Sequence, residues 1–423
     1  MAVEFYKEFG EFGYLANYSN YGFYKNGVYY KTVEHYYQSE KYDDLDIKQR
    51  IINCATAKDA ASIGRDRNNI RKNNFRLIKQ DVMLEGLLEK FRQNKDLMYK
   101  LIETRNEEII EMTIDEYYWG IGKNRTGQNN IGKLLMKTRE ILKREIIDNI
   151  ILKCKDKKIY IIGHNNPDAD SIFSAYLLNN IFNNFGINSS FAMLNNDFYS
   201  SSDEDLIRDN LRVKPEIICV ENNNFVLVDH NTIGDIPKEN VFGSFDHHVI
   251  ANEVENIIEM ERASTGLLLY DLFKDKYDFN EEEKKLILLT VLADTDYLHS
   301  TRFKEDDKAL FDELNSIVKL NIDEYKNKYF KTTDLSLSIE ENINRNVKFY
   351  SKLNLHRVLI TSNFEDDYEK LDNYIEYITK LNDKYLLIWA NYNREDTYIY
   401  YDGKKIKLNG ILTSTYKALE KIN

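Results

Sequence analysis

Aspartate and histidine residues gather at the ends of several apolar segments in the second half of the chain. Mixed carboxylate and imidazole sets of this kind suit Mn²⁺, Fe²⁺, Co²⁺ or Zn²⁺, and the absence of cysteine from them disfavours a structural zinc site. Five of the seven histidines of the chain belong to these clusters, which favours one metal site over many separate structural roles. The clustered residues are His164, Asp168, Asp170, Asp229, His230, Asp246, His247, His248, Asp294 and His299.

The segments that precede these residues have the pattern of buried parallel strands. "IYIIG", "FVLVD" and "VFGSFD" are short apolar runs that alternate with helical segments, as in a parallel sheet covered by helices. "DSIFSAYLLNNIF" predicts a helix that begins near Asp170 or Ser171. Because ligands of open α/β sheets bind at the carboxyl edge of the strands, we expect the clusters to meet there. For a single residue the structural alternative stays open, since Asp170 could simply cap the helix.

Five motifs of this region together resemble a known family. "GHNNPDADSIFSAY", "VLVDHN", "DHH", "ASTGLLLYDLF" and "ADTDYLHST" resemble the DHH phosphoesterases, and within them the family II manganese-dependent inorganic pyrophosphatases, over about residues 158–423. The resemblance implies two Mn²⁺ ions per site, with Mg²⁺ or Co²⁺ as alternatives. It implies His248 as a catalytic residue that faces the phosphate and Asp246 as the residue that orients the histidines. The implied metal ligands are His164 and Asp168 for one ion, Asp170, His247 and Asp294 for the other, and Asp229 as the bridge.

The C-terminal segment departs from this resemblance. The relatives carry a cationic cluster where "NGILTSTYKALEKI" has Thr, Ser, Thr and Tyr at residues 413–416. The resemblance implies Lys348 in "RNVKFY" as the equivalent of a phosphate-binding lysine of the relatives, and Arg302 and His299 are candidate replacements for the missing cations. Because arginine–phosphate contacts are strong and bidentate, their loss weakens binding of a small, highly charged anion. We therefore expect a nucleotide-type phosphoanhydride or phosphoester to be preferred over pyrophosphate.

A second candidate site lies in the aromatic first part of the chain. "TVEHYYQSEKY" predicts a helix that is capped near Thr32 and carries Glu34 among aromatic residues. Such a glutamate can act on a substrate, or it can be a capping residue beside core aromatics. Farther on, "DEYYWGIGKNRTGQNNIGK" is a glycine-rich loop that leads into a helix near Ile131. Loops of this kind favour anions, although this one lacks the preceding strand or the P-loop lysine that would make the motif specific.

The combination of motifs in the first part is more specific. "GYLANYSNYGFYKNGVYYKTVEHYYQSEKY", "ATAKDAASIGR", "DVMLEGLLEKF" and "DEYYWGIGKNRTGQNNIGKLLMKTR" resemble the NADAR family over about residues 4–146. Its members are N-glycosidases that act on ribosylamino pyrimidines or on ADP-ribosyl groups. Relatives often have Arg-Pro-Asp-Trp where residues 72–75 are Lys-Asn-Asn-Phe, which affects the choice of leaving base more than the reaction. The resemblance implies catalytic roles for Glu34, Asp115 and Trp119, and substrate-binding roles for Asn17, Lys41, Arg65, Gly120 and Asn129.

Composition limits the class of protein. The 423 residues suffice for two or three domains, and 43% hydrophobic with 30% charged residues is typical of globular proteins. We find no apolar run of membrane-spanning length and no export signal, and the three cysteines are scattered, so we expect a cytoplasmic protein without membrane contact. The net charge of −12 argues against broad contact with nucleic acid.

We expect an α/β multidomain protein. A mainly helical α+β NADAR domain is predicted at residues 1–148, and a DHH domain with a mainly parallel sheet covered by helices at residues 157–335. A small C-terminal α/β lobe that contributes to substrate binding is predicted at residues 340–423.

Together these features predict a bifunctional hydrolase, an N-glycosidase fused to a dinuclear-metal phosphohydrolase. Its expected partners are small nucleotide or ADP-ribose-type molecules, with ADP-ribosylated nucleic acid as a further candidate. Two alternatives stay open: a manganese-dependent pyrophosphatase whose first domain is an ADP-ribose sensor or antitoxin-like module, and a nuclease-like DHH enzyme. The sequence does not determine the oligomeric state.

Overall fold

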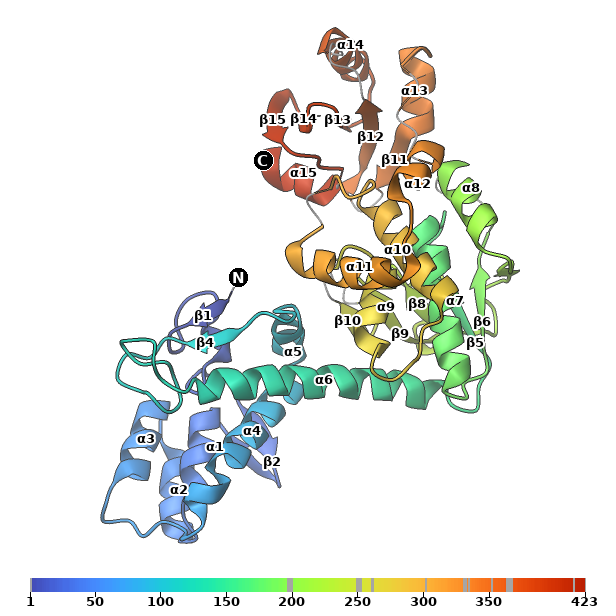
Figure 1. The fold of residues 1–423 in the computed structure, drawn as a ribbon. Coiled ribbons are helices and arrows are strands. Elements are labelled where there is room, and N and C mark those ends of the chain that lie inside the picture. The colour runs from blue at the N-terminus through green and yellow to red at the C-terminus, as the bar shows by residue number, and fades with distance from the viewer. Residues whose placement is uncertain are drawn as a thin grey trace. The chain divides into compact units, whose positions relative to one another are not determined.

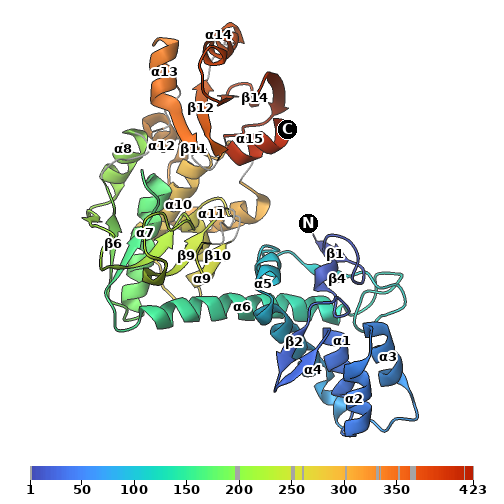
Figure 2. The ribbon, with the colours of Figure 1, turned by 180° about the vertical axis from the view of Figure 1, so that it is seen from behind.

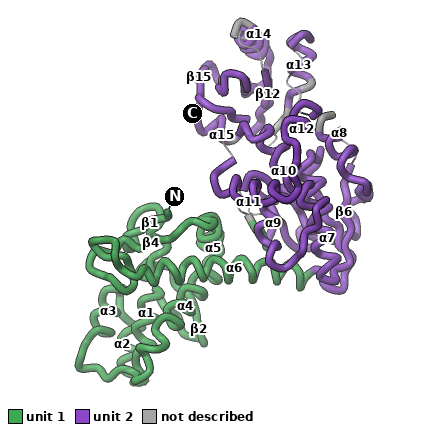
Figure 3. The backbone as a smooth tube through the Cα atoms, viewed as in Figure 1, with its two compact units in different colours: residues 1–153, 256–261 green, residues 154–255, 262–423 purple. Residues whose placement is uncertain are grey.

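The structure is a computed structural model of the 423-residue chain. It describes residues 2–195, 201–248, 253–259, 262–300, 303–329, 333, 335–350, 353–362, 368–413 and 415–422. The chain divides into two compact units, residues 1–153 with 256–261 and residues 154–255 with 262–423 (Figure 3). The domain limits inferred from the sequence stay predictions.

The first unit is mainly helical and has two small sheets. Strand β1 pairs in parallel with β4, and β2 forms an antiparallel hairpin with β3. The elements are β1 (Val3–Phe5), the short 3₁₀ helix η1 (Gly13–Leu15), β2 (Phe23–Lys25), β3 (Val28–Tyr30), α1 (Val33–Ser39), α2 (Leu45–Asn53), α3 (Ala57–Arg65), α4 (Phe75–Gln93), α5 (Lys95–Ile102), β4 (Ile109–Glu111) and α6 (Asn130–Cys154).

Helix α1 lies at the centre of the first unit. All seven of its residues are buried, and it contacts α2, α3 and α4 (Figure 1). Thr32 caps the helix, because its hydroxyl oxygen accepts a hydrogen bond from the backbone N–H of His35 at 3.2 Å. The burial brings Glu34 and Gln38 into the interior, where polar groups need hydrogen-bond partners.

Five strands of the second unit belong to a six-stranded sheet in the order β10-β9-β8-β5-β6-β7, whose edge strand β10 comes from residues 256–261. Strand β5 pairs in parallel with both β6 and β8, β6 with β7, and β8 with β9. The strands are β5 (Ile159–Ile162), β6 (Ser189–Met193), β7 (Glu216–Ile217), β8 (Asn224–Val228), β9 (Val241–Asp246) and β10 (Ile257–Glu259). The short helix η2 (Lys238–Asn240) precedes β9.

Helices cover this sheet (Figure 2). Helix α7 contacts β5, β6 and β8, α9 contacts β9, and α10 packs on α7 and α9. The central strands carry apolar residues on both faces, and Ile159, Ile161 and Val226 are fully buried, as expected for a parallel sheet between helices. The helices are α7 (Ala169–Asn184), α8 (Ser201–Asn210), α9 (Thr265–Phe273), α10 (Glu281–Asp294), α11 (Glu305–Val318) and α12 (Ile322–Tyr329).

The C-terminal part of the second unit forms a mixed five-stranded sheet in the order β11-β12-β13-β14-β15. Strands β12 and β13 are parallel and the other neighbours antiparallel. One core cluster of this sheet contains the fully buried Trp389, and a second joins the sheet to α15 through Ala418. The elements are α13 (Ile339–Asn346), β11 (Val347–Tyr350), β12 (Leu355–Ser362), α14 (Tyr368–Thr379), β13 (Tyr385–Asn391), β14 (Asp396–Tyr401), β15 (Lys404–Asn409) and α15 (Thr415–Ile422).

The fold class expected from the sequence is confirmed: a helical first part, a parallel sheet covered by helices, and a small mixed C-terminal sheet. In the described part of the chain, no helix is both long enough and apolar enough to cross a membrane.

Candidate functional sites

The buried carboxylate of Glu34 is the centre of the candidate site in the first unit. Its side chain enters the core from α1, and only 3% of the residue is exposed. Asn17 Nδ2 donates a hydrogen bond to Oε2 at 2.6 Å, while Gln38 Nε2 at 2.5 Å and the Tyr18 hydroxyl at 3.3 Å donate to Oε1. The backbone N–H of Glu34 also donates to the carbonyl of Asn17 at 2.9 Å. Three neutral donors therefore hold the carboxylate in one orientation.

Two cationic side chains belong to the surroundings of Glu34. Burial raises the pKa of Glu34, while the bond from Gln38 and the charges of Lys41 and Arg65 oppose this rise. Burial lowers the pKa of Lys41 to about 8. A carboxyl group with a raised pKa holds a proton more readily than an exposed one, which is a property of general acids and bases.

Glycine at position 64 has a steric reason in this site. A β-carbon on Gly64 would lie 1.9 Å from Gln38 Oε1, so only glycine leaves space for the glutamine that holds Glu34. Gln38 lies one turn after Glu34 on the same face of α1. The carbonyl of Gly64 in turn accepts hydrogen bonds from Lys41 Nζ at 3.4 Å and from the Tyr42 hydroxyl at 3.0 Å.

The glycine-rich loop after β4 is held by backbone hydrogen bonds and by the side chain of Glu116. The backbone N–H of Ile121 donates to the carbonyl of Glu111 at 3.0 Å, and a β-carbon on Gly120 would lie 2.9 Å from that same oxygen. Glu116 Oε1 accepts from the backbone N–H groups of Tyr118 and Trp119 at 3.0 and 3.3 Å. Hydrogen bonds therefore tie the loop to the end of β4 and to itself.

The residues predicted from this loop have different surroundings. Trp119 packs edge-on against Tyr37 and Tyr118, with ring centroids 5.6 and 5.0 Å apart. The side chain of Asn129 bonds to the backbone of β4, with Nδ2 donating to the carbonyl of Ile109 at 2.8 Å. Asp115 is exposed, and no hydrogen bond joins it to Glu34 among the described residues. Among the described residues, neither Asn129 nor Asp115 has a hydrogen bond to the Glu34 carboxylate, and their predicted roles stay predictions.

Sequence reasoning missed several residues of the first unit. Tyr18 follows Asn17 directly and donates to Glu34, so its position beside a predicted residue was the available signal. Glu111 ends strand β4 and is 9% exposed; its Oε1 accepts from Thr113, whereas its Oε2 is buried without a hydrogen-bond partner. Burial, together with the charges of Glu116 and Glu34, raises the pKa of Glu111 to about 7.

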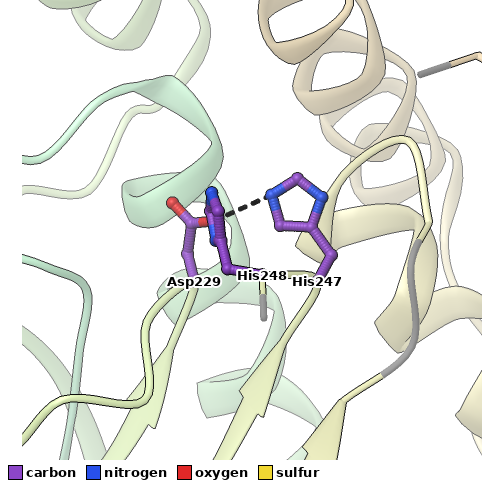
Figure 4. A group of neighbouring side chains, drawn as sticks. All are labelled: Asp229, His247 and His248. Atoms are coloured by element: carbon purple, nitrogen blue, oxygen red, sulfur yellow. Dashed lines mark ion pairs between the residues drawn. The ribbon is translucent and has the colours of Figure 1, made fainter. Parts of the chain in front are cut away.

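In the second unit, the predicted clusters meet at the carboxyl ends of β5, β8 and β9. His164 and Asp168 follow β5, Asp229 follows β8, and His247 follows β9. Among the residues that the structure describes, three groups of possible metal-binding side chains result, in each of which the ligand atoms lie within 4.8 Å of one another. The groups are Asp229 with His247 and His248 (Figure 4), His164 with Asp168 and Asp229, and Asp170 with His247 and Asp294.

Asp229 is shared between these groups. Its Oδ2 lies 3.4 Å from His164 Nε2, and its Oδ1 lies 3.3 Å from His247 Nε2. His164 Nε2 also lies 3.4 Å from Asp168 Oδ2. His247 Nε2 lies 3.3 Å from Asp294 Oδ2 and 3.8 Å from Asp170 Oδ2. The two oxygens of Asp229 thus face two different ligand sets, as a bridging carboxylate must.

Helix starts and hydroxyl groups fix the carboxylates. Asp170 accepts from the backbone N–H groups of Thr265 and Gly266, at 2.7 and 3.0 Å, at the beginning of α9. Asp229 accepts from the hydroxyls of Ser171 at 2.7 Å and Thr265 at 3.2 Å. Asp168 caps α7 by accepting from the backbone N–H of Ser171 at 3.0 Å. The cap of this helix is therefore Asp168, and Asp170 lies in its first turn.

The residues fit a divalent cation. Nδ1 of His247 bonds to the carbonyl of Arg262 at 2.9 Å, so Nε2 faces the carboxylates, and this buried atom has no hydrogen-bond partner. Burial disfavours a charged histidine, yet Asp294 and Asp229 raise the pKa of His247 well above its usual value. Burial and the charge of Asp229 raise the pKa of Asp170 well above its usual range. A bound cation would neutralise the negative charge of several carboxylates gathered around an imidazole nitrogen that makes no hydrogen bond.

Asp246 and His248 form a separate pair. Asp246 Oδ1 lies 2.8 Å from His248 Nδ1 and accepts from the backbone N–H of His248 at 3.0 Å. Asn231 Nδ2 holds the other oxygen at 2.5 Å. Asp246 was expected to orient both histidines, but it orients His248, because the carbonyl of Arg262 binds His247 instead.

The residues predicted for the phosphate side are less fully described. Arg302 and Ser414 lie outside the described residues, as do the side chains of Lys348 in β11 and Tyr416 in α15. His299 Nε2 lies 2.7 Å from Lys326 Nζ. The hydroxyl of Thr413 donates to Asp296 Oδ2 at 3.1 Å. The binding roles of these residues stay predictions.

Two known protein families match the two parts of the chain. The NADAR domain model matches residues 4–143, and the model of the DHH family N-terminal domain matches residues 158–295. An N-glycosidase from Nostoc punctiforme is 35% identical over 143 residues, which are 33% of this chain and 92% of the relative. The N-glycosidase YbiA of Escherichia coli K12 is 32% identical over 140 residues, 33% of this chain and 88% of the relative.

The chain therefore contains two hydrolase domains, and it is an enzyme. It belongs, through its first unit, to the NADAR family of YbiA-like N-glycosidases, and this domain is followed by a DHH phosphoesterase domain. Among solved structures, a putative family II inorganic pyrophosphatase of Methanococcus jannaschii is similar at 20% identity, with a TM-score of 0.49, over 62% of this chain and 98% of that chain.

Proposed function

We propose that the protein is a bifunctional hydrolase. Its first unit uses Glu34 to cleave N-glycosidic bonds of ADP-ribosyl or ribosylamino-type substrates. Its second unit uses two divalent cations to hydrolyse a nucleotide-type phosphoanhydride or phosphoester, with Mn²⁺ as the preferred metal and Mg²⁺ or Co²⁺ as alternatives. The observation that carries the second activity is the division of the two Asp229 oxygens between His164 and His247. The corresponding observation for the first is a buried Glu34 held by three neutral donors.

In the glycosidase reaction, positive charge develops on the sugar as its bond to the base breaks. A carboxylate fixed beside that sugar stabilises the charge without having to reorient, because Asn17, Tyr18 and Gln38 already hold it. Its raised pKa makes Glu34 a stronger base than an exposed carboxylate, which favours transfer of a proton from the attacking water. The partly exposed ring of Trp119 offers a flat surface for the departing base.

In the phosphohydrolase reaction, His164 and Asp168 would hold one cation, Asp170, His247 and Asp294 the other, and Asp229 both. When bound, the cations supply positive charge for phosphoryl oxygens and lower the pKa of a water molecule. His248 is the open member of the group, with 45% of its side chain exposed. The Asp246 carboxylate holds a proton on Nδ1 of His248, which leaves Nε2 of His248 to exchange a proton with the leaving oxygen.

The C-terminal segment supports a nucleotide-type substrate. Hydroxyl groups replace cations in the sequence of residues 413–416, and Thr413 is engaged with Asp296. A site with fewer cations binds pyrophosphate less well, whereas hydroxyl and tyrosine side chains suit a sugar or a base. ADP-ribose or another product of the first unit fits this description. We place the enzyme in a reducing cytoplasm, which suits its three free cysteines.

The test uses the full chain and mass spectrometry of products. The substrates are ADP-ribosylated DNA, NAD-type metabolites, ribosylamino pyrimidines and pyrophosphate, each with and without Mn²⁺. We expect release of a free base without Mn²⁺ and of phosphate products only with it. If no free base appears from any N-glycoside, the first activity is refuted and a sensor role for the first unit takes its place.

A further inference from the structure

Lys90 is a completely buried lysine in the first unit that the proposed mechanism does not use. It lies in α4, and none of its surface is exposed. Its Nζ donates hydrogen bonds to the carbonyl of Tyr14 at 2.5 Å, the carbonyl of Ala16 at 2.9 Å and the hydroxyl of Ser19 at 2.7 Å. A buried ammonium group is tolerated only when its hydrogen bonds are satisfied, and here three N–H groups meet three oxygens.

The three acceptors belong to one short segment, residues 14–19. The Ser19 hydroxyl also donates to the carbonyl of Ala16 at 2.7 Å, so Lys90 and Ser19 together bind the oxygens of this segment. Burial lowers the pKa of Lys90 to about 7, but only the protonated amine has a hydrogen for each of the three oxygens. Lys90 is therefore the group around which this segment folds, although α4 is about 70 residues away in sequence.

The same segment supplies two of the three donors to Glu34. Asn17 donates to Oε2 and Tyr18 to Oε1, and the carbonyl of Asn17 accepts from the backbone of Glu34. Asn17 lies between the carbonyl of Ala16 and the hydroxyl of Ser19, both of which bind Lys90. A displacement of the segment would change the direction of both donors at once.

We propose that Lys90 is a positioning residue of the glycosidase: it fixes residues 14–19 so that Asn17 and Tyr18 hold the Glu34 carboxylate in its reactive orientation. This inference rests on the proposed glycosidase function. Lys90 does not touch the carboxylate, and its effect reaches Glu34 through the segment. A lysine that served stability alone would not need its three acceptors to flank the residues that bind the catalytic group.

The segment has a second attachment, which makes the inference testable. The Tyr14 hydroxyl donates to the carbonyl of Lys100 in α5 at 3.0 Å. Replacement of Lys90 by methionine keeps the length of the side chain but removes the three hydrogen bonds, so we expect the segment to loosen while the unit stays folded. Leu87→Ala is the matched control, because Leu87 is a fully buried residue of the same helix and its truncation lowers stability by leaving a cavity.

The experiment measures glycosidase kinetics in the full chain with an N-glycoside cleaved by the parent. We expect Lys90→Met to lower kcat by about tenfold or more while KM changes by less than about threefold, because positioning acts on the transition state. Leu87→Ala should lower the melting temperature and leave kcat within about twofold. A Lys90→Met enzyme with the parental kcat would overturn the proposal. Ser19→Ala, which removes one acceptor, should give a smaller loss and serves if Lys90→Met does not fold.

A double-mutant cycle separates positioning from general destabilisation. If Lys90 acts through the segment, the losses of kcat caused by Lys90→Met and by Asn17→Ala are not additive. The double variant is then about as active as the less active of the two single variants. Full additivity would overturn the proposal. Hydrogen exchange provides a readout independent of activity: amides of residues 13–19 should lose protection in Lys90→Met, and unchanged protection would also overturn it. An inactive parent enzyme would instead refute the glycosidase function itself.

Discussion

Glu34 and Asp229 are both fully buried carboxylates, but their surroundings differ. Neutral amide and hydroxyl groups donate to Glu34, and burial raises its pKa. Asp229 is buried as deeply, yet His164 and His247 hold its pKa well below the usual range, and other carboxylates adjoin it. Burial alone therefore does not decide the chemistry of a carboxylate; the groups that contact it do.

The difference between the two carboxylates predicts that the two sites differ in their need for a metal ion. In the Glu34 site, side chains of the protein itself donate a hydrogen bond to each oxygen of the carboxylate. The Asp229 site brings four aspartates together with His164 and His247, and the buried Nε2 of His247 has ion-pair distances to carboxylates but no hydrogen bond. The first site should work without metal, and the second should require it for substrate binding as well as for reaction.

The largest effect is expected from Asp229→Ala. Because both ligand sets lose their shared carboxylate, phosphohydrolysis should fall by at least about 10³-fold and the bound metal should fall with it. Rate measurements with Mn²⁺ and elemental analysis of the purified protein check both. Glycosidase activity is the internal control and should be unchanged. An Asp229→Ala protein that retains two tightly bound ions and full rate would refute the shared-carboxylate site.

The next effect is expected from Glu34→Gln. The amide keeps the shape of the side chain but removes the charge that stabilises the developing cation, so N-glycosidic cleavage should fall by about 10²-fold or more. Glu40→Gln, at the end of the same helix, is the matched control, because Glu40 contacts only Lys48 and Lys72 among the ion pairs observed for it. Equal glycosidase rates in Glu34→Gln and the parent would make Glu34 a structural residue.

A smaller difference should separate the substrates of the second unit. With Mn²⁺, kcat/KM should be about tenfold higher for a nucleotide-type phosphoanhydride than for pyrophosphate, since residues 413–416 lack the cations that bind a bare phosphate. Steady-state kinetics over a panel that includes ADP-ribose measure this ratio. A kcat/KM for pyrophosphate above that of every nucleotide tested would show that the second unit is an ordinary pyrophosphatase. Arg302 or Lys417 would then bind the phosphate in place of the cationic cluster of the relatives.

The smallest effect concerns stability and pH. The pKa of Glu111 is raised from 4.5 to about 7, so the folded protein holds this proton more tightly than the unfolded chain. Ionisation of Glu111 therefore destabilises the fold as pH rises from about 4.5 through 7, by up to about 3 kcal/mol. Relative to the parent, Glu111→Gln should gain stability between pH 5 and pH 8.5, because glutamine does not ionise.

Trp119 fluorescence makes this measurement specific. The chain has two tryptophans, Trp119 in the first unit and Trp389 in the second, so a Trp389→Phe background reports unfolding of the first unit alone. Parallel pH profiles of stability for the parent and Glu111→Gln would contradict the raised pKa of Glu111.

Much of the second site could be predicted because its signals are local. Most of the acids and histidines follow apolar strands, and Asp294 ends the apolar helix α10. Because the carboxyl ends of parallel strands meet at one edge of a sheet, spacing along the chain indicates proximity. Less of the Glu34 site could be predicted from the sequence. Motifs identified the family and Glu34, but they did not show that Asp115 is exposed or that the Asn129 side chain binds the backbone of β4.

The sequence by itself determined the fold class, the positions of the apolar strands and helices, and the residue types that can bind metal or carry charge. Tertiary structure decided which atoms meet: Asp229 divides its oxygens between two histidines, the carbonyl of Arg262 orients His247, and Lys90 gathers the oxygens of residues 14–19. Periodicity and spacing are properties of neighbouring residues, whereas a hydrogen-bond partner is chosen by the approach of segments far apart in the chain, where tenths of an ångström and the loss of water determine the energy.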